Sequence, residues 1–357
     1  MASRERIRFV DGHNDVLLAL HKAGAGAEVF LARRADGHLD LVRAREGGFG
    51  AGFFAIFVPP EDERPDWKPP TREPPYEVPL AEPIPHGWAR READAMIDLL
   101  REIERGSAGR VAVGRSAEDL DREALAAILH FEGAEPIDPE LDTLEELYER
   151  GLRSLGLVWS RPNAFAEGVP FRFPASPDTG PGLTGAGRRL VRECNLLGIV
   201  LDVSHLNERG FWDVARLSDA PLVASHSNAH ALCAVSRNLT DAQLDEIGRS
   251  DGIVGITFHA GMLREDGRVE AATPLARVVD HVEYVVERIG VDHVGFGSDF
   301  DGAVVIDELG DAAGLPRLVD ALRDRGYAAG EIAKLTHQNW LRVLHATLRC
   351  RPRRRRL

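Results

Sequence analysis

The most constraining feature of this chain is a series of short apolar runs, each of which ends in side chains that can bind a metal. The runs are RFVDGHND, AILHFEG, GIVLDVSH, PLVASHS and HVGFGSDF. They recur about once every forty residues, and buried strands that end in such side chains are typical of a parallel barrel with its site at the C-terminal mouth. His, Asp and Glu ligands suit zinc or a similar divalent ion, which indicates a metal-dependent hydrolase. The six residues concerned are His13, Asp15, Glu132, His205, His226 and Asp299.

Eight strands can be predicted from the apolar runs of the sequence. Most runs are continuous rather than alternating, as expected for strands that are covered on both faces of a parallel sheet. Helical patterns lie between them, and several of these end in glycine, a common helix stop. The alternation predicts an α/β fold, a (β/α)8 TIM-like barrel of the metal-dependent hydrolase type, as a single domain over residues 1–348. The strands are expected at Ile7–Asp11, Gly52–Val58, Ala126–Phe131, Leu152–Trp159, Gly198–Val203, Pro221–Ser225, Gly252–Phe258 and His293–Gly297.

Two segments interrupt the alternation, and both are expected to lie over the C-terminal mouth. Residues 59–85 follow the second strand and are rich in proline and charge, so they form either a disordered excursion or a lid or subunit contact. Residues 163–185 follow the fourth strand, and their two phenylalanines and Pro/Gly-rich end predict an ordered loop on the substrate side. Residues 349–357 are expected to be a basic, solvated tail.

Charge and cysteine usage exclude several classes of protein. The formal net charge is −13, so a nucleic-acid partner is not expected. The three cysteines are widely spaced and form no CxxC pair, which favours a reducing compartment. The N-terminus lacks the apolar segment of a signal peptide, and no apolar run is long enough to span a membrane. We therefore expect a cytoplasmic protein with neither a membrane nor a nucleic acid as partner.

The candidate ligands fall into two groups. His13 and Asp15 are two residues apart, so in an extended strand both side chains face the same way and can reach one metal. Glu132 follows an apolar run, where a carboxylate is costly unless it is paired or metal-bound, and its two oxygens can bridge two cations. His205 and His226 end consecutive strands, and their imidazoles would complete a second metal site beside the first.

Two further residue types at the strand ends suit substrate chemistry. Asp299, in GFGSDFDG, could shuttle a proton to a leaving amine, but Asp301 lies on the same face by the same period and the pattern does not separate them. Arg237, after the sixth strand, could hold a substrate carboxylate with its forked donors or could form a surface ion pair. Four other histidines are expected to be structural or peripheral: His130, His230, His259 and His337.

These stretches together resemble the membrane dipeptidase (renal dipeptidase) family, the M19 metallopeptidases of the amidohydrolase superfamily. The matching stretches are DGHND, HFEG, DVSH, ASHSNAHALCAVSRN and VGFGSDFDG, and the resemblance extends over about residues 8 to 345. It implies a zinc-dependent dipeptidase in which a hydroxide bridging two metals attacks the peptide bond, and many family members accept a D-residue at the C-terminal position. It also implies two Zn²⁺ per chain, one held by His13, Asp15 and Glu132 and the other by Glu132, His205 and His226. Asp299 matches the catalytic acid/base of the family, and Arg237 matches its carboxylate-binding arginine.

The chain departs from the family pattern after the fourth strand. Where animal members carry a histidine that contacts substrate, the sequence LGLVWSRPN places Trp159. We expect Trp159 either to narrow the pocket and bind substrate or only to pack beneath the 163–185 loop. The leading hypothesis is a dipeptidase that acts as a homodimer on a small dipeptide substrate. Alternatives are an amidohydrolase acting on another small amide, N-acyl amino acid or lactone, and a barrel retained for binding, against which the intact ligand set argues.

Overall fold

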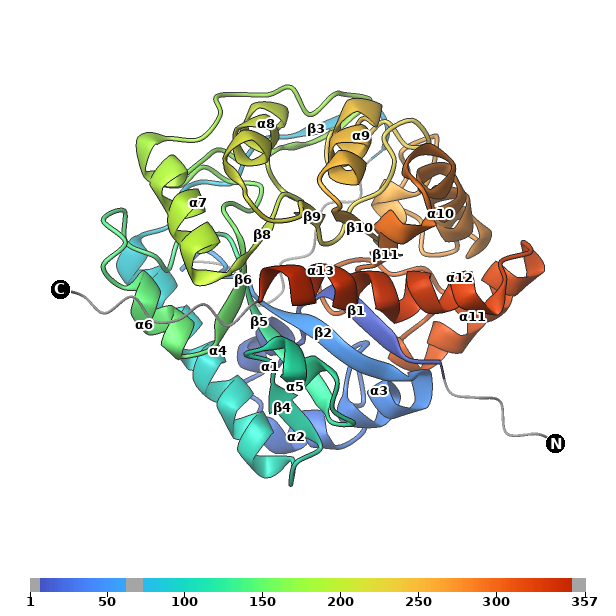
Figure 1. The fold of residues 1–357 in the computed structure, drawn as a ribbon, viewed down its shortest axis with the longest axis horizontal. Coiled ribbons are helices and arrows are strands. Elements are labelled where there is room, and N and C mark those ends of the chain that lie inside the picture. Colours follow the sequence, from blue (N-terminus) through green and yellow to red (C-terminus); the bar gives the residue numbers. More distant parts are fainter. Residues whose placement is uncertain (1–6, 62–72, 349–357) are drawn as a thin grey trace.

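A closed parallel barrel forms the centre of the computed structural model, which describes residues 7–61 and 73–348 (Figure 1). Eight strands follow one another in the order β2-β1-β11-β10-β9-β8-β6-β5, and pairing of β2 with β5 closes the ring. Each strand overlaps one of the eight runs expected from the sequence, so the predicted (β/α)8 barrel is confirmed. The strands are β1 (Phe9–Asn14), β2 (Phe49–Ile56), β5 (Leu125–Glu132), β6 (Leu152–Gly156), β8 (Val200–Asp202), β9 (Val223–Ala224), β10 (Ile253–Ile256) and β11 (Val294–Phe296).

Helices surround the barrel and pack their apolar faces on the strands (Figure 1). Local signals set several of their ends: the Thr184 side chain caps α7 by accepting from the Gly187 amide, and Gly198 ends it with a φ of 74°. The helices are α1 (Val16–Lys22), α2 (Ala27–Leu31), α3 (Leu41–Gly47), α4 (His86–Gly106), α5 (Ala117–Leu120), α6 (Leu144–Glu149), α7 (Gly185–Leu197), α8 (Glu208–Leu217), α9 (Asp241–Arg249), α10 (Ala276–Ile289), α11 (Leu315–Asp324), α12 (Ala329–Ala333) and α13 (Asn339–Thr347). Short 3₁₀ turns lie at Ala260–Met262, Val291–His293 and Ala312–Gly314, and a π-helical segment, Lys334–Gln338, precedes α13.

The C-terminal helix α13 covers the N-terminal opening of the barrel. Trp340 is fully buried among apolar side chains of the barrel interior, and its indole nitrogen donates to the Phe296 carbonyl at 3.0 Å. Arg342 donates to carbonyls at the starts of β10 and β11, those of Gly252 and Asp292. Since this end is plugged, the C-terminal mouth is the end of the barrel at which a site can form.

One strand of the main sheet was not expected from the sequence. β4 (Val111–Val113) pairs with the first half of β5, while β6 pairs with the second half of the same edge. The run is only three residues long and therefore gives little periodic signal.

The two mouth segments pair with each other. β3 (Tyr76–Val78), from the first, and β7 (Phe171–Phe173), from the second, form an antiparallel ribbon in which Val78 lies opposite Phe171. The 73–85 part of the first segment is thus tied to the 163–185 loop and is not a disordered excursion; the lid and the subunit contact both stay predictions. Residues 62–72 and the basic tail 349–357 lie outside the described residues. Within the described ranges, no helix is long and apolar enough to cross a membrane.

Candidate metal centre

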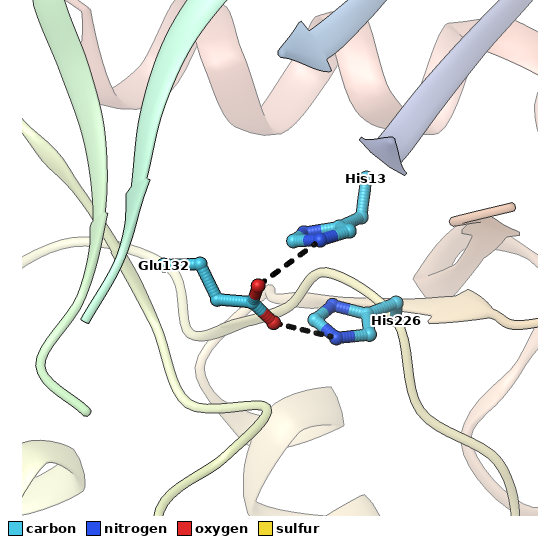
Figure 2. Close-up of side chains that lie close together, drawn as sticks. All are labelled: His13, Glu132 and His226. Atoms are coloured by element: carbon cyan, nitrogen blue, oxygen red, sulfur yellow. Dashed lines mark ion pairs between the residues drawn. The ribbon is translucent and has the colours of Figure 1, made fainter. Parts of the chain in front are cut away.

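The structure brings the six predicted residues together at the C-terminal mouth. His13 lies in β1, Glu132 is the last residue of β5, and Asp299 follows β11. His205 and His226 lie just beyond β8 and β9. The carboxyl ends of parallel strands meet at one rim of a barrel, so residues up to 286 positions apart (13 to 299) become neighbours. Figure 2 shows His13, Glu132 and His226 pointing toward one another from three different strand ends.

The first group of ligand atoms centres on His13, which is fully buried. Its Nε2 atom lies 3.3 Å from Asp15 Oδ2 and 3.7 Å from Glu132 Oε2. Asp15 is not part of the extended strand, because β1 ends at Asn14 and Asp15 has φ −105° and ψ 26° at the start of α1. The two side chains therefore meet at the turn from strand to helix, rather than through the strand alternation that the sequence suggested.

The second group centres on the other carboxylate oxygen of Glu132. Oε1 lies 2.9 Å from His205 Nε2 and 3.5 Å from His226 Nε2, and the two imidazole nitrogens are 3.1 Å apart. Ligand atoms bound about 2 Å from a tetrahedral zinc ion lie roughly 3.3 Å from one another. The distances in both groups are close to that spacing, and ligand atoms of His13, Glu132 and His226, and of His13, Asp15 and Asp299, lie within 4.8 Å of one another, so these residues could hold metal.

The electrostatics of the centre also suit a cation. Burial together with the neighbouring carboxylates Asp15 and Asp299 raises the pKa of Glu132 to about 8, although His13 opposes this. Burial would lower the pKa of His13, but Glu132 and Asp15 raise it to about 10. For His205 and His226, burial lowers the pKa well below the usual value, so both rings are neutral and can act as ligands. A bound cation would offset the cost of gathering carboxylates in a buried place.

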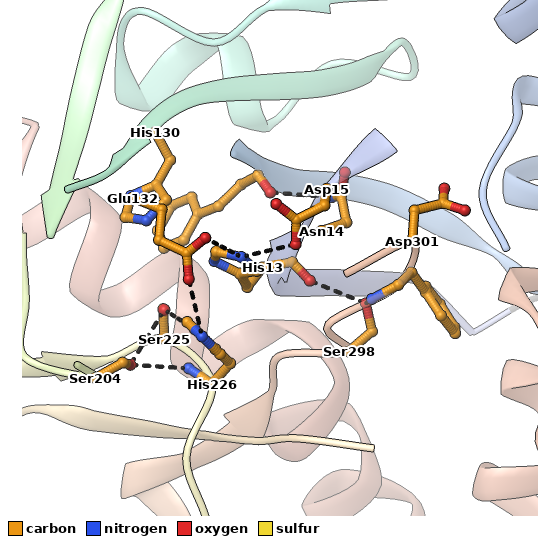
Figure 3. A network of polar contacts seen from close by, with 12 residues as sticks. His13, Asn14, Asp15, His130, Glu132, Ser204, Ser225, His226, Ser298 and Asp301 are labelled. Carbon is orange, nitrogen blue, oxygen red and sulfur yellow. Dashed lines mark hydrogen bonds and ion pairs between the residues drawn. The ribbon is translucent and has the colours of Figure 1, made fainter. Parts of the chain in front are cut away.

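The structure separates Asp299 from Asp301. The Asp299 carboxylate lies within 4.8 Å of the ligand atoms of His13 and Asp15, and burial raises its pKa to about 6. Figure 3 shows the Asp301 carboxylate turned away from His13. It accepts hydrogen bonds from Arg34 Nη1 at 3.0 Å and from the His38 amide at 2.8 Å. Of the two carboxylates, Asp299 therefore lies with the candidate metal ligands, and Asp301 is engaged elsewhere.

Arg237 lies against the second group of ligands. Its guanidinium donates to Ser227 Oγ at 2.8 Å and to the His226 carbonyl at 3.1 Å, and Nη2 lies 2.9 Å from His226 Nε2. The side chain is 3% exposed, and burial lowers its pKa to about 10. It is not the surface ion pair that the sequence left open, because its partners here are groups of the centre.

Trp159 forms an aromatic cluster beside His205. Its ring centroid is 4.9 Å from that of Phe57, 6.2 Å from that of Phe171 and 6.0 Å from that of His205. Phe171 belongs to β7, so pairing of the two mouth segments brings it to the centre. Phe57 is the residue after β2. The sequence analysis did not identify it as a site residue, because it belongs to no motif and only its position at a strand end pointed to the mouth.

Supporting residues of the loop that carries Asp299 also escaped the sequence analysis. Asp11 accepts from the Ser298 amide at 2.6 Å and from Ser298 Oγ at 3.0 Å, and burial raises the pKa of Asp11 to about 7. The Asp299 amide donates to the His13 carbonyl at 3.0 Å, which ties the loop to β1. His130, expected to be structural, is fully buried, with Nδ1 2.9 Å from Ser154 Oγ and its ring 5.4 Å edge-on to that of His13.

Comparison with known proteins gives a consistent set of relatives. A family model described as membrane dipeptidase (peptidase family M19) matches residues 3–355. A solved metallo peptidase from Rhodobacter sphaeroides, liganded with a phosphinate mimic of the dipeptide L-Ala-D-Ala, is 48% identical with a TM-score of 0.91, covering 96% of this chain and all of that one. An uncharacterised protein in the pqqA 5′ region of Klebsiella pneumoniae is 49% identical over 250 residues, 69% of this chain and 92% of its own length. Dipeptidase tcpJ of Claviceps purpurea is 30% identical over 345 residues, 94% of this chain and 76% of its own.

Proposed function

Because the chain belongs to the membrane dipeptidase family, peptidase family M19, we propose that it is a dinuclear zinc dipeptidase. The observation that carries this proposal is the placement of Glu132. One of its oxygens faces His13, and the other faces His205 and His226, as a carboxylate shared by two cations requires. Two bound zinc ions would polarise the scissile carbonyl and lower the pKa of an attacking water. In this proposal His13, Asp15 and Glu132 hold one ion, and Glu132, His205 and His226 hold the other.

Asp299 is proposed to move the proton. It stands beside His13 and Asp15, where burial favours its protonated form and raises its pKa. A carboxylate in this position can accept a proton from the attacking water and return it to the leaving amine. The carbonyl carbon then gains the oxygen and the C–N bond breaks, which yields two amino acids.

Arg237 is proposed to bind the free carboxylate of the dipeptide. It is a buried cation at the mouth, next to the second group of ligands, and its forked donors match a carboxylate. This role explains a preference for dipeptides, because a substrate of that length places its C-terminal carboxylate one residue from the scissile bond.

Trp159 is proposed to contact the substrate side chain. It is half-buried and lies next to His205, together with Phe57 and Phe171. An indole has one donor and no acceptor, so it would select by apolar packing rather than by hydrogen bonding. A D-residue at the C-terminal position is proposed as an accepted substrate, with support from the L-Ala-D-Ala mimic bound to the Rhodobacter sphaeroides relative.

A substrate panel with the zinc-loaded enzyme tests the proposal. L-Ala-D-Ala and L-Ala-L-Ala should be hydrolysed faster than the C-terminal amides of these dipeptides, N-acetyl-alanine or a simple lactone. Arg237→Ala should reduce kcat/KM for free dipeptides by about 10- to 100-fold, equivalent to the roughly 1.5–3 kcal/mol of a charged hydrogen bond, and should change the amides much less. Arg237→Lys keeps the charge but loses the forked donors, so its kcat/KM for free dipeptides should lie between those of the wild type and Arg237→Ala. Faster turnover of N-acyl amino acids or lactones than of every dipeptide would reject the dipeptidase assignment.

We also propose a cytoplasmic location, which the two buried free thiols, Cys194 and Cys233, support. The homodimer stays a prediction, and sedimentation velocity with the zinc-loaded protein would check it.

A further inference from the structure

Behind the second group of ligands lies a buried carboxylate with four donors. Asp202, the last residue of β8, is 3% exposed. Its Oδ1 accepts from the Ser204 amide at 3.0 Å, from Ser204 Oγ at 2.7 Å and from the Ser225 amide at 2.9 Å. Its Oδ2 accepts from Ser225 Oγ at 2.5 Å. Asp202 thus connects the ends of β8 and β9, from which the ligands His205 and His226 follow.

The direction of each hydrogen bond around His226 can be deduced. An ionised carboxylate can only accept, so the 2.5 Å contact makes Ser225 Oγ the donor to Asp202 Oδ2. The neutral ring then carries its hydrogen on Nδ1, which lies 2.7 Å from Ser225 Oγ. Ser225 Oγ therefore accepts from the ring and gives its own hydrogen to Asp202. Hydrogen bonds thus run from His226 through Ser225 to Asp202, and His226 Nε2 carries no hydrogen, so its lone pair is available to a metal ion.

We propose that Asp202 is a positioning residue that acts through Ser225 to set the tautomer and orientation of His226 for the second metal ion. The inference rests on the proposed function only in its use of a bound metal. Histidine ligands commonly donate their second ring nitrogen to a carboxylate or a related acceptor, which fixes the ring and raises its basicity. Here a serine hydroxyl stands between the two.

The backbone around Ser225 is held by contacts that do not involve its hydroxyl. A Cβ atom at Gly12, Gly255 or Gly297 would overlap the Ser225 carbonyl oxygen, so glycines on β1, on β10 and just after β11 let the end of β9 pass close to them. The His226 amide donates to Ser204 Oγ at 3.1 Å, as Figure 3 shows. The main chain would therefore stay in place without the Ser225 hydroxyl, and the ring alone would lose its partner.

His205 is held differently. Its Nδ1 atom faces Ser160 Oγ and Arg237 Nε, each at 3.2 Å. Removal of the relay should therefore weaken one ligand of the second ion and leave the first group, with His13 and Asp15, intact.

Metal titration of purified variants tests the proposal. Wild-type protein and Ser225→Ala are stripped of metal and titrated with Co²⁺ against a chelator, with absorbance as the readout. Wild-type protein should bind two equivalents. Ser225→Ala should bind one of them with unchanged affinity and the other about 10- to 100-fold more weakly. Asp202→Asn combined with Ser225→Ala should be no weaker than Asp202→Asn alone, because both act through one chain of hydrogen bonds.

Ser107→Ala is the matched control, because it also removes a fully buried serine hydroxyl. Ser107 Oγ donates to the Glu104 carbonyl at 2.8 Å and accepts from the Val111 amide at 3.0 Å, and neither partner belongs to a group of ligands. Both single alanine variants should lower the apo-protein melting temperature to a similar extent, and only Ser225→Ala should change metal affinity. Equal metal losses in the two variants, unchanged binding in Ser225→Ala, or additive losses in the double variant would overturn the relay. A wild-type protein that binds two ions but cleaves no dipeptide would reject the proposed function and leave this inference standing.

Discussion

Exchange of Asp299 and, separately, Asp301 for asparagine gives a direct test of the proposed proton transfer. The two residues lie on one loop, both have a left-handed backbone with φ of 60° and 67°, and the substitution keeps their shape. Asparagine cannot accept and return a proton. General acid–base catalysis typically contributes about 10²- to 10⁴-fold, so Asp299→Asn should lower kcat by that factor, or about 2.7–5.5 kcal/mol of barrier.

Asp301→Asn should instead cost stability. The Asp301 side chain is 2% exposed and accepts from Arg34 Nη1 and from the His38 amide. The oxygen of an asparagine can keep one of these bonds. Its NH₂ group would then face the second N–H donor, and that hydrogen bond would be lost. Loss of one charged hydrogen bond is worth about 1.5–3 kcal/mol, which should appear in the free energy of unfolding. We expect kcat of this variant to stay within a few-fold of wild type.

Three measurements on each variant separate the possible roles: zinc content, kcat at saturating L-Ala-D-Ala, and urea unfolding. Full turnover in an Asp299→Asn enzyme that retains two zinc ions would refute the proton-transfer role. Loss of zinc from Asp299→Asn would show that this residue is primarily a ligand, as its place near His13 and Asp15 also allows. Equal loss of kcat in both variants would mean that the loop as a whole, rather than Asp299, supports catalysis.

Three further predictions concern other parts of the molecule. Glu132→Gln should bind fewer than two zinc ions per chain by elemental analysis, because a neutral amide cannot serve two cations; full occupancy would contradict the shared-ligand geometry. Trp159→His should change the ranking of substrates in a dipeptide panel, whereas a uniform change would mean that Trp159 only packs beneath its loop. Burial lowers the pKa of His281 to about 4, and its ring accepts from the Ala229 amide, so it stabilises the fold fully above pH 6.5 and progressively less as the pH falls toward 4. Between pH 7 and pH 5 wild-type protein should lose about 2 kcal/mol more unfolding free energy than His281→Gln, and equal losses would contradict this.

The sequence by itself determined the barrel and the set of residues at its mouth. Continuous apolar runs alternating with amphipathic segments can be read locally, because strands and helices have fixed periods. In a parallel barrel all strand ends share one rim, so His13, Glu132, His205 and His226 could be grouped without knowledge of their distances.

The tertiary structure decided the features that depend on long-range geometry. Asp299 and Asp301 share a period and a motif, and only the positions of Arg34 and His38 show which carboxylate is engaged elsewhere. The partner of each mouth segment could not be deduced either, because the three residue pairs of β3 and β7 form no pattern in either stretch alone.

The same limit applies to the Asp202–Ser225–His226 relay. Aspartate and serine occur throughout the sequence, and these two became partners because β8 pairs with β9, with Asp202 opposite Val223. Local periodicity specifies which residues reach the rim, whereas hydrogen-bond partners a few ångströms apart depend on how distant segments pack.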